Sequence, residues 1–141
     1  MSNVRERLVK ATLEWEQFFG NAPQSTTVLS EYDAAMLVGM SEVEYSSAMQ
    51  GVTAVQKGFD FRFREKRYQV KGNRPSGKRG SEVTWVPKAT NYNWDFLVWV
   101  LYNKSYEVQE AWLWDVDQYR VEFHEIKRLS PLHLRKGVRL K

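Results

Sequence analysis

Hydrophobic residues recur every three or four positions at the two ends of the chain and alternate with polar residues near its middle. The first pattern predicts an amphipathic helix over residues 3–19, which the Gly- and Pro-containing residues 20–23 end. A second amphipathic stripe predicts a helix over residues 116–128 that covers a sheet. The N-terminal stripe consists of Val4, Leu8, Ala11, Trp15 and Phe18.

Another helix is expected after residues 24–29, whose polar and β-branched side chains are typical of a linker. Ser30 is its predicted N-cap, and Asp33 at the third helical position completes a capping box. The helix extends to about residue 38, and residues 41–48 either continue or restart it.

The stretch GFDFRFREKRYQVKG at residues 58–72 alternates between apolar and polar side chains, as expected of a β-hairpin with one buried face. A two-residue turn at Glu65 and Lys66 would place Asp60 opposite Lys71, with Gln69 beside them. The turn has no Asn-Gly or Asp-Gly signature, and a register slip of one residue would scatter this set. The simpler interpretation of Asp60 and Lys71 is a cross-strand ion pair on a solvated face.

Residues 94–102, WDFLVWVLY, form a nearly continuous apolar run, which predicts a strand buried on both faces at the centre of a mixed sheet. Residues 106–114 are its predicted neighbour, and Ser130 with Pro131 predicts a short final helix. We therefore expect an α/β fold in the order α, α, β, β, β, β, α, with helices flanking a mixed central sheet. The strand tryptophans are expected in the core: Trp99, Trp112 and Trp114.

Composition fits a single domain without disulfides. The chain has 141 residues, of which 43% are hydrophobic, and it contains no cysteine, which excludes thiolate zinc sites. No segment approaches the roughly 18 apolar residues of a membrane span. The charged N-terminus lacks the apolar stretch of a secretion signal. A cytoplasmic protein with no membrane association is therefore expected.

The net charge of +4 is unevenly distributed along the chain. Residues 57–88 hold ten basic and three acidic residues, and residues 127–141 hold six basic and no acidic ones. This asymmetry indicates a polyanionic partner, and we favour DNA contact over a merely solvated loop for the Gly-rich, cationic residues 72–85. The candidate phosphate contacts are Arg62, Arg74, Lys78, Arg79 and Lys88.

The GFD of residues 58–60 and the QVK of residues 69–71 resemble the core motif of the PD-(D/E)XK nuclease superfamily, which includes many restriction endonucleases and resolvases. In that superfamily an aspartate ends one strand and an acid-x-Lys follows on the next. Gln69 stands where the superfamily usually has Asp or Glu, a variant that resembles the Mrr type of methyl-directed restriction enzymes. The resemblance covers about residues 30–115. It implies one restriction endonuclease-like domain over residues 1–141, in which residues 116–141 are a C-terminal helix and a basic tail.

The resemblance also implies Mg²⁺-dependent hydrolysis of phosphodiester bonds in DNA, with Mn²⁺ as a substitute metal. Glu31 and Asp60 would be metal ligands, together with the Val70 carbonyl. For Glu31 the simpler interpretation is an acid that suits a helix dipole. Lys71 would act on the attacking water and offset charge on the phosphate, while Gln69 offers only a neutral oxygen, which favours one-metal catalysis. DNA is the expected partner, and a homodimer is left open.

Two other function classes remain. A catalytically inactive relative of the same fold would bind nucleic acid through its basic residues without turnover, and a protein-interaction domain would need neither property. The sequence contains no P-loop, GxGxxG, GxSxG or HExxH motif, which argues against nucleotide-cofactor, serine-hydrolase and zincin chemistry. His124 and His133 are the only histidines, and their spacing does not predict a pair of metal ligands.

Overall fold

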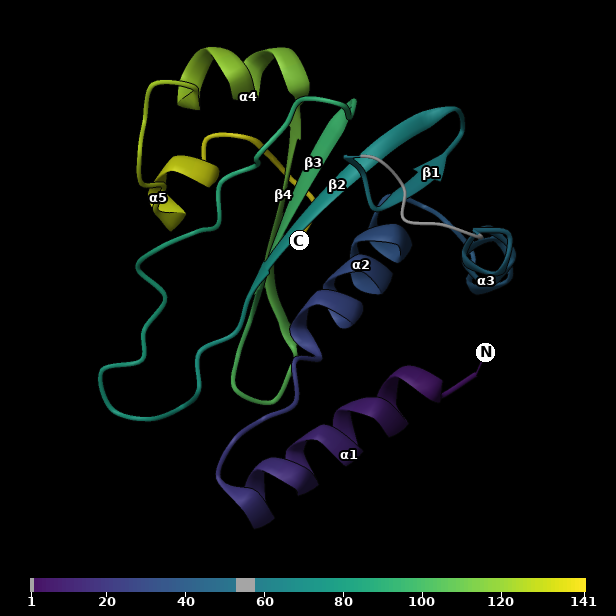
Figure 1. The fold of residues 1–141 in the computed structure, drawn as a ribbon, viewed down its shortest axis with the longest axis vertical. Coiled ribbons are helices and arrows are strands. Elements are labelled where there is room, and N and C mark those ends of the chain that lie inside the picture. Colours follow the sequence, from purple (N-terminus) through teal and green to yellow (C-terminus); the bar gives the residue numbers. More distant parts are fainter. Residues whose placement is uncertain (1, 53–57) are drawn as a thin grey trace.

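A computed structural model describes residues 2–52 and 58–141, which contain five helices and five strands (Figure 1). The helices are α1 (Val4–Phe19), α2 (Thr26–Leu37), α3 (Glu42–Gln50), α4 (Val116–Phe123) and α5 (Pro131–Leu134). The strands are β1 (Phe61–Phe63), β2 (Lys66–Asn73), β3 (Phe96–Tyr102), β4 (Val108–Asp115) and β5 (Val138–Arg139). None of the helices in these ranges has the length and apolar character that a membrane crossing requires.

Within the described residues, the strands form one mixed sheet in the order β1-β2-β3-β4-β5. β2 and β3 pair in parallel, and the other neighbouring strands pair antiparallel. β3 lies at the centre, and its residues Leu97, Val98, Trp99 and Val100 are each 0% exposed. The predicted buried central strand and the mixed sheet with flanking helices are therefore confirmed.

Two hydrophobic clusters pack on the two faces of the sheet, because side chains alternate along each strand. Helices α1, α2 and α3 cover the face that carries Val70 and Val98, whereas α4 and α5 cover the face that carries Leu97 and Trp99. Figure 1 shows these two groups of helices on opposite sides of the sheet. Trp99 and Trp114 are buried, and Trp112 packs partly buried beside them, as predicted.

The first two helices differ in how well the sequence predicted them. α1 matches the N-terminal prediction, and Gly20 ends it with a left-handed φ of 83°. α2 begins at Thr26, so the predicted N-cap Ser30 is wrong: Ser30 is a buried interior residue whose hydroxyl donates to the Thr27 carbonyl. Residues 24–29 resembled a linker because β-branched residues are poor helix formers, but the complete burial of Leu29 outweighs that propensity.

α3 is a separate helix. The Glu44 amide donates to the Ser41 hydroxyl and the Ser41 amide donates to the Glu44 carboxylate, each at 3.1 Å, so the restart is the correct alternative. α4 ends at Phe123, before the predicted residue 128, because the chain turns to bury Leu129 in a β-bridge with Val86. α5 confirms the predicted short final helix. β5, within the basic tail, was not predicted, since a strand of two residues carries no readable pattern.

β1 and β2 form the predicted hairpin in a different register. The turn residues are Arg64 and Glu65, with φ values of 50° and 66°, so the predicted turn at residues 65–66 is wrong. Phe61 pairs with Tyr68, and their rings stack with centroids 4.9 Å apart and an interplanar angle of 6°. The stacked rings stabilise the observed register across the two strands.

The register error is a shift of two residues, so it preserves which side chains share a face. The observed pairing ends at Phe61 and Tyr68, and the Asp60 amide also donates to the Tyr68 carbonyl, whereas the sequence had placed Asp60 opposite Lys71. Asp60 is therefore shifted along β2 relative to the prediction.

Candidate active site

A close contact between α2 and β2 sets the position of Glu31. A Cβ atom on Gly72 would lie 2.7 Å from Ser30 Cβ and 2.8 Å from Ser30 Oγ, so glycine allows the helix to approach the strand this closely. Ser30 is buried at this contact, and the next residue along α2 is the half-buried Glu31. The contact thereby holds Glu31 near β2.

Asp60 is fixed just before β1 by two hydrogen bonds to β2. Its amide donates to the Tyr68 carbonyl at 2.7 Å, and its carboxylate Oδ2 accepts from the Val70 amide at 2.7 Å. Gly58 makes the preceding turn with a φ of 80°, and a Cβ atom there would lie 2.6 Å from Asn91 Oδ1. The glycine two residues before the aspartate is thus required by both its backbone angle and its close neighbour.

Glu31 and Asp60 form a carboxyl pair at this edge of β2. The Glu31 carboxyl is hydrogen-bonded to Asp60. Burial, reinforced by the charge of Asp60, raises the pKa of Glu31 to about 7. Burial also raises the pKa of Asp60, although the Val70 amide and the charge of Lys71 favour its ionised form. The two carboxyl groups therefore share a proton more readily than ordinary surface acids do.

Lys71 lies close enough to Asp60 for its charge to lower the pKa of that carboxyl. Alternation along β2 puts Gln69 on the same face as Lys71. The amide and carbonyl of one strand residue point to the same side, so the Val70 carbonyl, like its amide, is directed toward Asp60. Asp60 thus links the two other groups: its carboxyl pairs with that of Glu31, and the charge of Lys71 acts on it from β2.

The oxygen donors of this cluster suit a hard cation. Mg²⁺ is commonly bound through one or two carboxylates and keeps several waters, which fits Glu31, Asp60 and one backbone carbonyl. In residues 2–52 and 58–141, no group of three or more His, Cys, Asp or Glu side chains could hold a metal ion. The neutral Gln69 is consistent with that finding, because a third acid is absent from its position.

Two of the predicted phosphate contacts support the fold instead. Arg74 binds the carboxylate of Glu16 through both Nη atoms, at 2.9 and 3.0 Å, and its side chain is 6% exposed. Lys88 donates from Nζ to the carbonyls of His124 and Ile126, at 2.8 Å each. We therefore remove Arg74 and Lys88 from the set of candidate phosphate contacts. The sequence did not reveal these roles, since the partners are 36 to 58 residues away.

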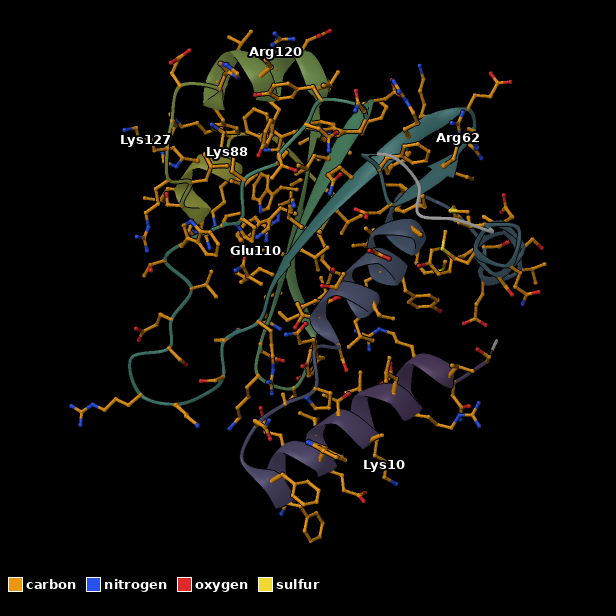
Figure 2. The ribbon with its side chains drawn as sticks, viewed as in Figure 1. Lys10, Arg62, Lys88, Glu110, Arg120 and Lys127 are labelled. Carbon is orange, nitrogen blue, oxygen red and sulfur yellow. The ribbon has the colours of Figure 1, made fainter. Side chains whose placement is uncertain are left out.

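The other three predicted cations, Arg62, Lys78 and Arg79, are exposed. The Arg62 guanidinium lies over the Phe59 ring, 5.2 Å from its centroid. Figure 2 shows Arg62 at the β1–β2 hairpin and Lys88 beside α4 and α5. Lys57, the first residue of the basic segment predicted from the sequence, lies outside the described residues.

Residues 85–91, in the segment that precedes β3, run back along β2 toward the carboxyl pair. At the end of β2, the Asn73 side-chain amide donates to the Trp85 carbonyl at 3.2 Å. At the other end of this segment, Asn91 lies against Gly58, just before β1. Trp85 is 48% exposed, while the next residue, Val86, is 1% exposed and fixes the backbone. This path was not predicted from the sequence, because loop composition gives no direction in space.

A buried ion pair next to Glu31 on α2 was also missed. Asp33 is 7% exposed and accepts from Arg5 Nε at 2.6 Å, from Arg5 Nη2 at 2.8 Å and from the Tyr102 hydroxyl. Arg5 Nη2 also donates to the Tyr106 carbonyl at 2.8 Å. The predicted capping role of Asp33 is wrong, because the residue lies inside α2. This network joins α1, α2 and β3 through residues that no sequence motif connects.

Sequence comparison does not assign the chain to a family: no family model matches it, and no curated protein matches it significantly. The geometry of Glu31, Asp60 and Lys71 is therefore the basis on which a function can be inferred.

Replacing Glu31 with Gln is expected to change how stability depends on pH. The pKa of Glu31 is about 7 in the folded protein against an ordinary value of 4.5. The stabilisation from its raised pKa is complete below pH 4.5 and is lost as the pH rises through about 7, because the folded state keeps a proton that the unfolded state has released. Wild type should therefore lose stability relative to E31Q over this range, by at most about 1.4 kcal/mol per pH unit. Urea unfolding at a series of pH values measures the effect, and parallel profiles for the two proteins would contradict it.

Proposed function

We propose that this protein hydrolyses phosphodiester bonds in DNA with Mg²⁺ as its metal cofactor. The proposal is carried by the carboxyl pair of Glu31 and Asp60, on which the charge of Lys71 acts. Two acids and a nearby lysine are the groups that metal-assisted hydrolysis requires. The net charge of +4 and the exposed cations of the hairpin and the following loop support a polyanionic substrate.

Each side chain has a distinct role in this proposal. Glu31 and Asp60, with the Val70 carbonyl, would hold Mg²⁺, which when bound lowers the pKa of a water molecule and offsets charge on the phosphate. The Lys71 ammonium orients the attacking water and stabilises the negative charge that develops on the phosphate oxygens. Gln69 contributes a neutral amide in place of a third carboxylate, which favours a single ion.

A restriction endonuclease-like topology is part of the proposal. Its support is the order of elements around the site: α2 carries Glu31, an antiparallel hairpin carries Asp60 and Lys71, and β3 then pairs in parallel with β2. The same order accommodates the PD-(D/E)XK resemblance with a Gln-x-Lys motif in β2. A shared topology alone would not imply catalysis, so the side chains carry the functional argument.

DNA would contact the face of the molecule that holds the hairpin and the loop after β2. Arg62, Lys78 and Arg79 are the proposed phosphate contacts, since each is exposed. The exposed ring of Trp85, on a backbone fixed by Asn73, offers a surface on which a base can stack.

Cleavage assays with and without metal test the proposal. Supercoiled, linear duplex and single-stranded DNA are each incubated with the protein in Mg²⁺, Mn²⁺ or EDTA, and we expect cleavage that EDTA abolishes. Gln69→Glu adds a carboxylate and should tighten Mn²⁺ binding by roughly tenfold, measured by calorimetry. If Mn²⁺ affinity is unchanged in Gln69→Glu and the wild type cleaves no form of DNA, the nuclease proposal is wrong.

Catalytically inactive DNA binding is the second candidate function. It is favoured by Gln69, which removes one negative charge from the position of a usual metal ligand. Under this alternative the basic surface binds DNA, and the carboxyl pair has no role in turnover.

Combined replacement of Lys78 and Arg79 by Ala should weaken DNA binding under both candidates. Each lost phosphate contact is expected to reduce the slope of log affinity against log salt by about one. The matched control replaces Lys127 and Arg128, two exposed cations beyond α4, and should have a smaller effect. Fluorescence anisotropy over a salt series measures both variants. Absence of wild-type binding at low salt would favour a protein-interaction domain instead.

A further inference from the structure

The outer face of α1 is rich in exposed apolar side chains. Trp15 is 50% exposed, Phe18 76% and Phe19 66%, and the Trp15 and Phe19 ring centroids are 4.6 Å apart. Because α-helical residues are about 100° apart around the axis, the Trp15 and Phe18 rings lie on a single stripe roughly 80° wide, and Phe19 lies just beyond its edge. Exposed patches of this kind mark interaction sites in soluble proteins. The stripe consists of Val4, Leu8, Ala11, Trp15 and Phe18, all of which are exposed except Leu8, which is partly buried against the core.

α1 packs on the rest of the protein through a different face. Val9 and Thr12 are buried, and Arg5 and Glu16 make ion pairs with α2 and with the loop after β2. These four residues are centred about 110° around the helix from the exposed stripe. Figure 1 shows α1 as an outlying helix, so its other side faces away from the sheet. The stripe is therefore available to a partner.

A groove of about 610 Å³ adjoins the N-terminal half of the stripe, between α1, α2 and α3. Val28 and Val43 on its walls are 56% and 76% exposed. α1 thus carries projecting aromatic rings toward its C-terminal end and an apolar groove beside its N-terminal end. The apolar lining includes Val4, Leu8, Val28, Val43, Tyr45 and Met49.

We propose that this face binds a second copy of the chain, in a two-fold symmetric dimer with antiparallel α1 helices. Pairing centred near Ala11 puts Phe18 of each copy opposite Val4 of the other, at the mouth of the groove. A two-fold interface must be self-complementary, and a helix with rings at one end and a groove at the other meets that condition. The small side chain of Ala11 allows the two helices to approach closely where they cross.

The charges beside the stripe fit the same arrangement. Arg7 and Glu14 are both exposed and lie on the same flank of the stripe, about two helical turns apart. In the antiparallel pair, Arg7 of each copy faces Glu14 of the other, which gives two symmetric ion pairs. In a parallel two-fold pair these flanks would lie on opposite sides of the interface, and the charges would not meet. A second copy therefore supplies aromatic rings for the groove and opposite charges for Arg7 and Glu14 on the flank of the stripe.

Sedimentation velocity of the full chain over a concentration series tests the proposal. We expect the wild type to form a dimer that dissociates on dilution, and Phe18→Asp to weaken it by roughly thirtyfold or more. Arg7→Glu should also weaken the dimer, because it faces two like-charged contacts. The double variant Arg7→Glu/Glu14→Arg should recover wild-type affinity, since the charges are exchanged and the pairs are restored.

Lys10→Glu is the matched control, because Lys10 lies further around α1 from the stripe, on its outer side (Figure 2). It should leave the dimer affinity near the wild-type value, and circular dichroism verifies that each variant is folded. A wild type that stays monomeric at every concentration would overturn the proposal, even if it bound lipid vesicles or another protein. A dimer that tolerates Phe18→Asp, or one that the charge exchange does not restore, would overturn it as well.

Discussion

Asp60→Asn is expected to reduce Mg²⁺-dependent DNA cleavage by about a thousandfold or more, equivalent to roughly 4 kcal/mol of transition-state stabilisation. The amide keeps an oxygen that can accept from the Val70 amide, so the backbone contact seen at 2.7 Å is preserved while the ligand charge is lost. Without metal, DNA affinity should stay equal or rise, because repulsion between the carboxylate and phosphate is removed. Single-turnover cleavage and metal-free anisotropy measure the two effects separately.

Lys71→Ala is the second variant to be measured in the same cleavage and DNA-binding assays. It should lower the cleavage rate by about 100-fold or more, since a charge directed at the developing negative phosphate is removed. Its DNA affinity should fall slightly, in the opposite direction to that of Asp60→Asn. Asp117→Asn, an exposed acid on α4, is the matched control and should cleave like wild type. Normal cleavage by either site variant would show that the carboxyl pair and Lys71 are not the catalytic groups.

The largest effect on stability is expected from Asp33→Ala, which should lower the free energy of unfolding by about 3 kcal/mol. Asp33 accepts two hydrogen bonds from Arg5 and one from Tyr102, and its side chain is 9% exposed. Removing the carboxylate leaves the buried Tyr102 hydroxyl without its acceptor and leaves the mostly buried Arg5 guanidinium with only the Tyr106 carbonyl and the exposed Glu6. Breaking a buried pair in this way lowers stability by more than the intact pair adds to it. Urea unfolding followed by tryptophan fluorescence measures the loss.

Glu6→Ala is the matched control for the same arginine. Glu6 also pairs with Arg5, at 2.9 Å, but its side chain is 70% exposed. Surface ion pairs contribute little to stability, so the expected loss in the free energy of unfolding for Glu6→Ala is below about 0.5 kcal/mol. Comparable losses for Asp33→Ala and Glu6→Ala would mean that burial does not set the strength of these contacts.

The hairpin illustrates how much of the site the sequence could predict. Strand alternation identified the polar set of Asp60, Gln69 and Lys71, because a side chain's face depends only on whether its position is odd or even. The register depends on the turn, and Arg64 and Glu65 adopt positive φ without the Gly or Asn that usually announces it. The prediction therefore placed the right residues on one face but set the wrong pairs opposite each other.

Long-range contacts explain most of the remaining errors. Glu31 was predicted from a resemblance, and it reaches Asp60 although the helix start assigned beside it was wrong. The close approach of α2 to β2 depends on Gly72, a residue that in the sequence indicates only loop chemistry. Arg74 had the charge expected of a phosphate contact, but Glu16 lies in a helix far earlier in the chain and binds it. Charge and composition carry no information about such partners.

The short strand β5 pairs with β4 at one edge of the sheet. β4 would otherwise offer unpaired amides and carbonyls along that side, and such edges recruit strands from other molecules. β5 covers part of it, and the chain continues the contact as the Leu140 amide donates to the Ala111 carbonyl at 2.7 Å. The cover is cationic, with Arg139 lying over the Trp112 ring and Lys141 following it. The basic tail thus covers part of a strand edge, a structural role that its charge alone would not have suggested.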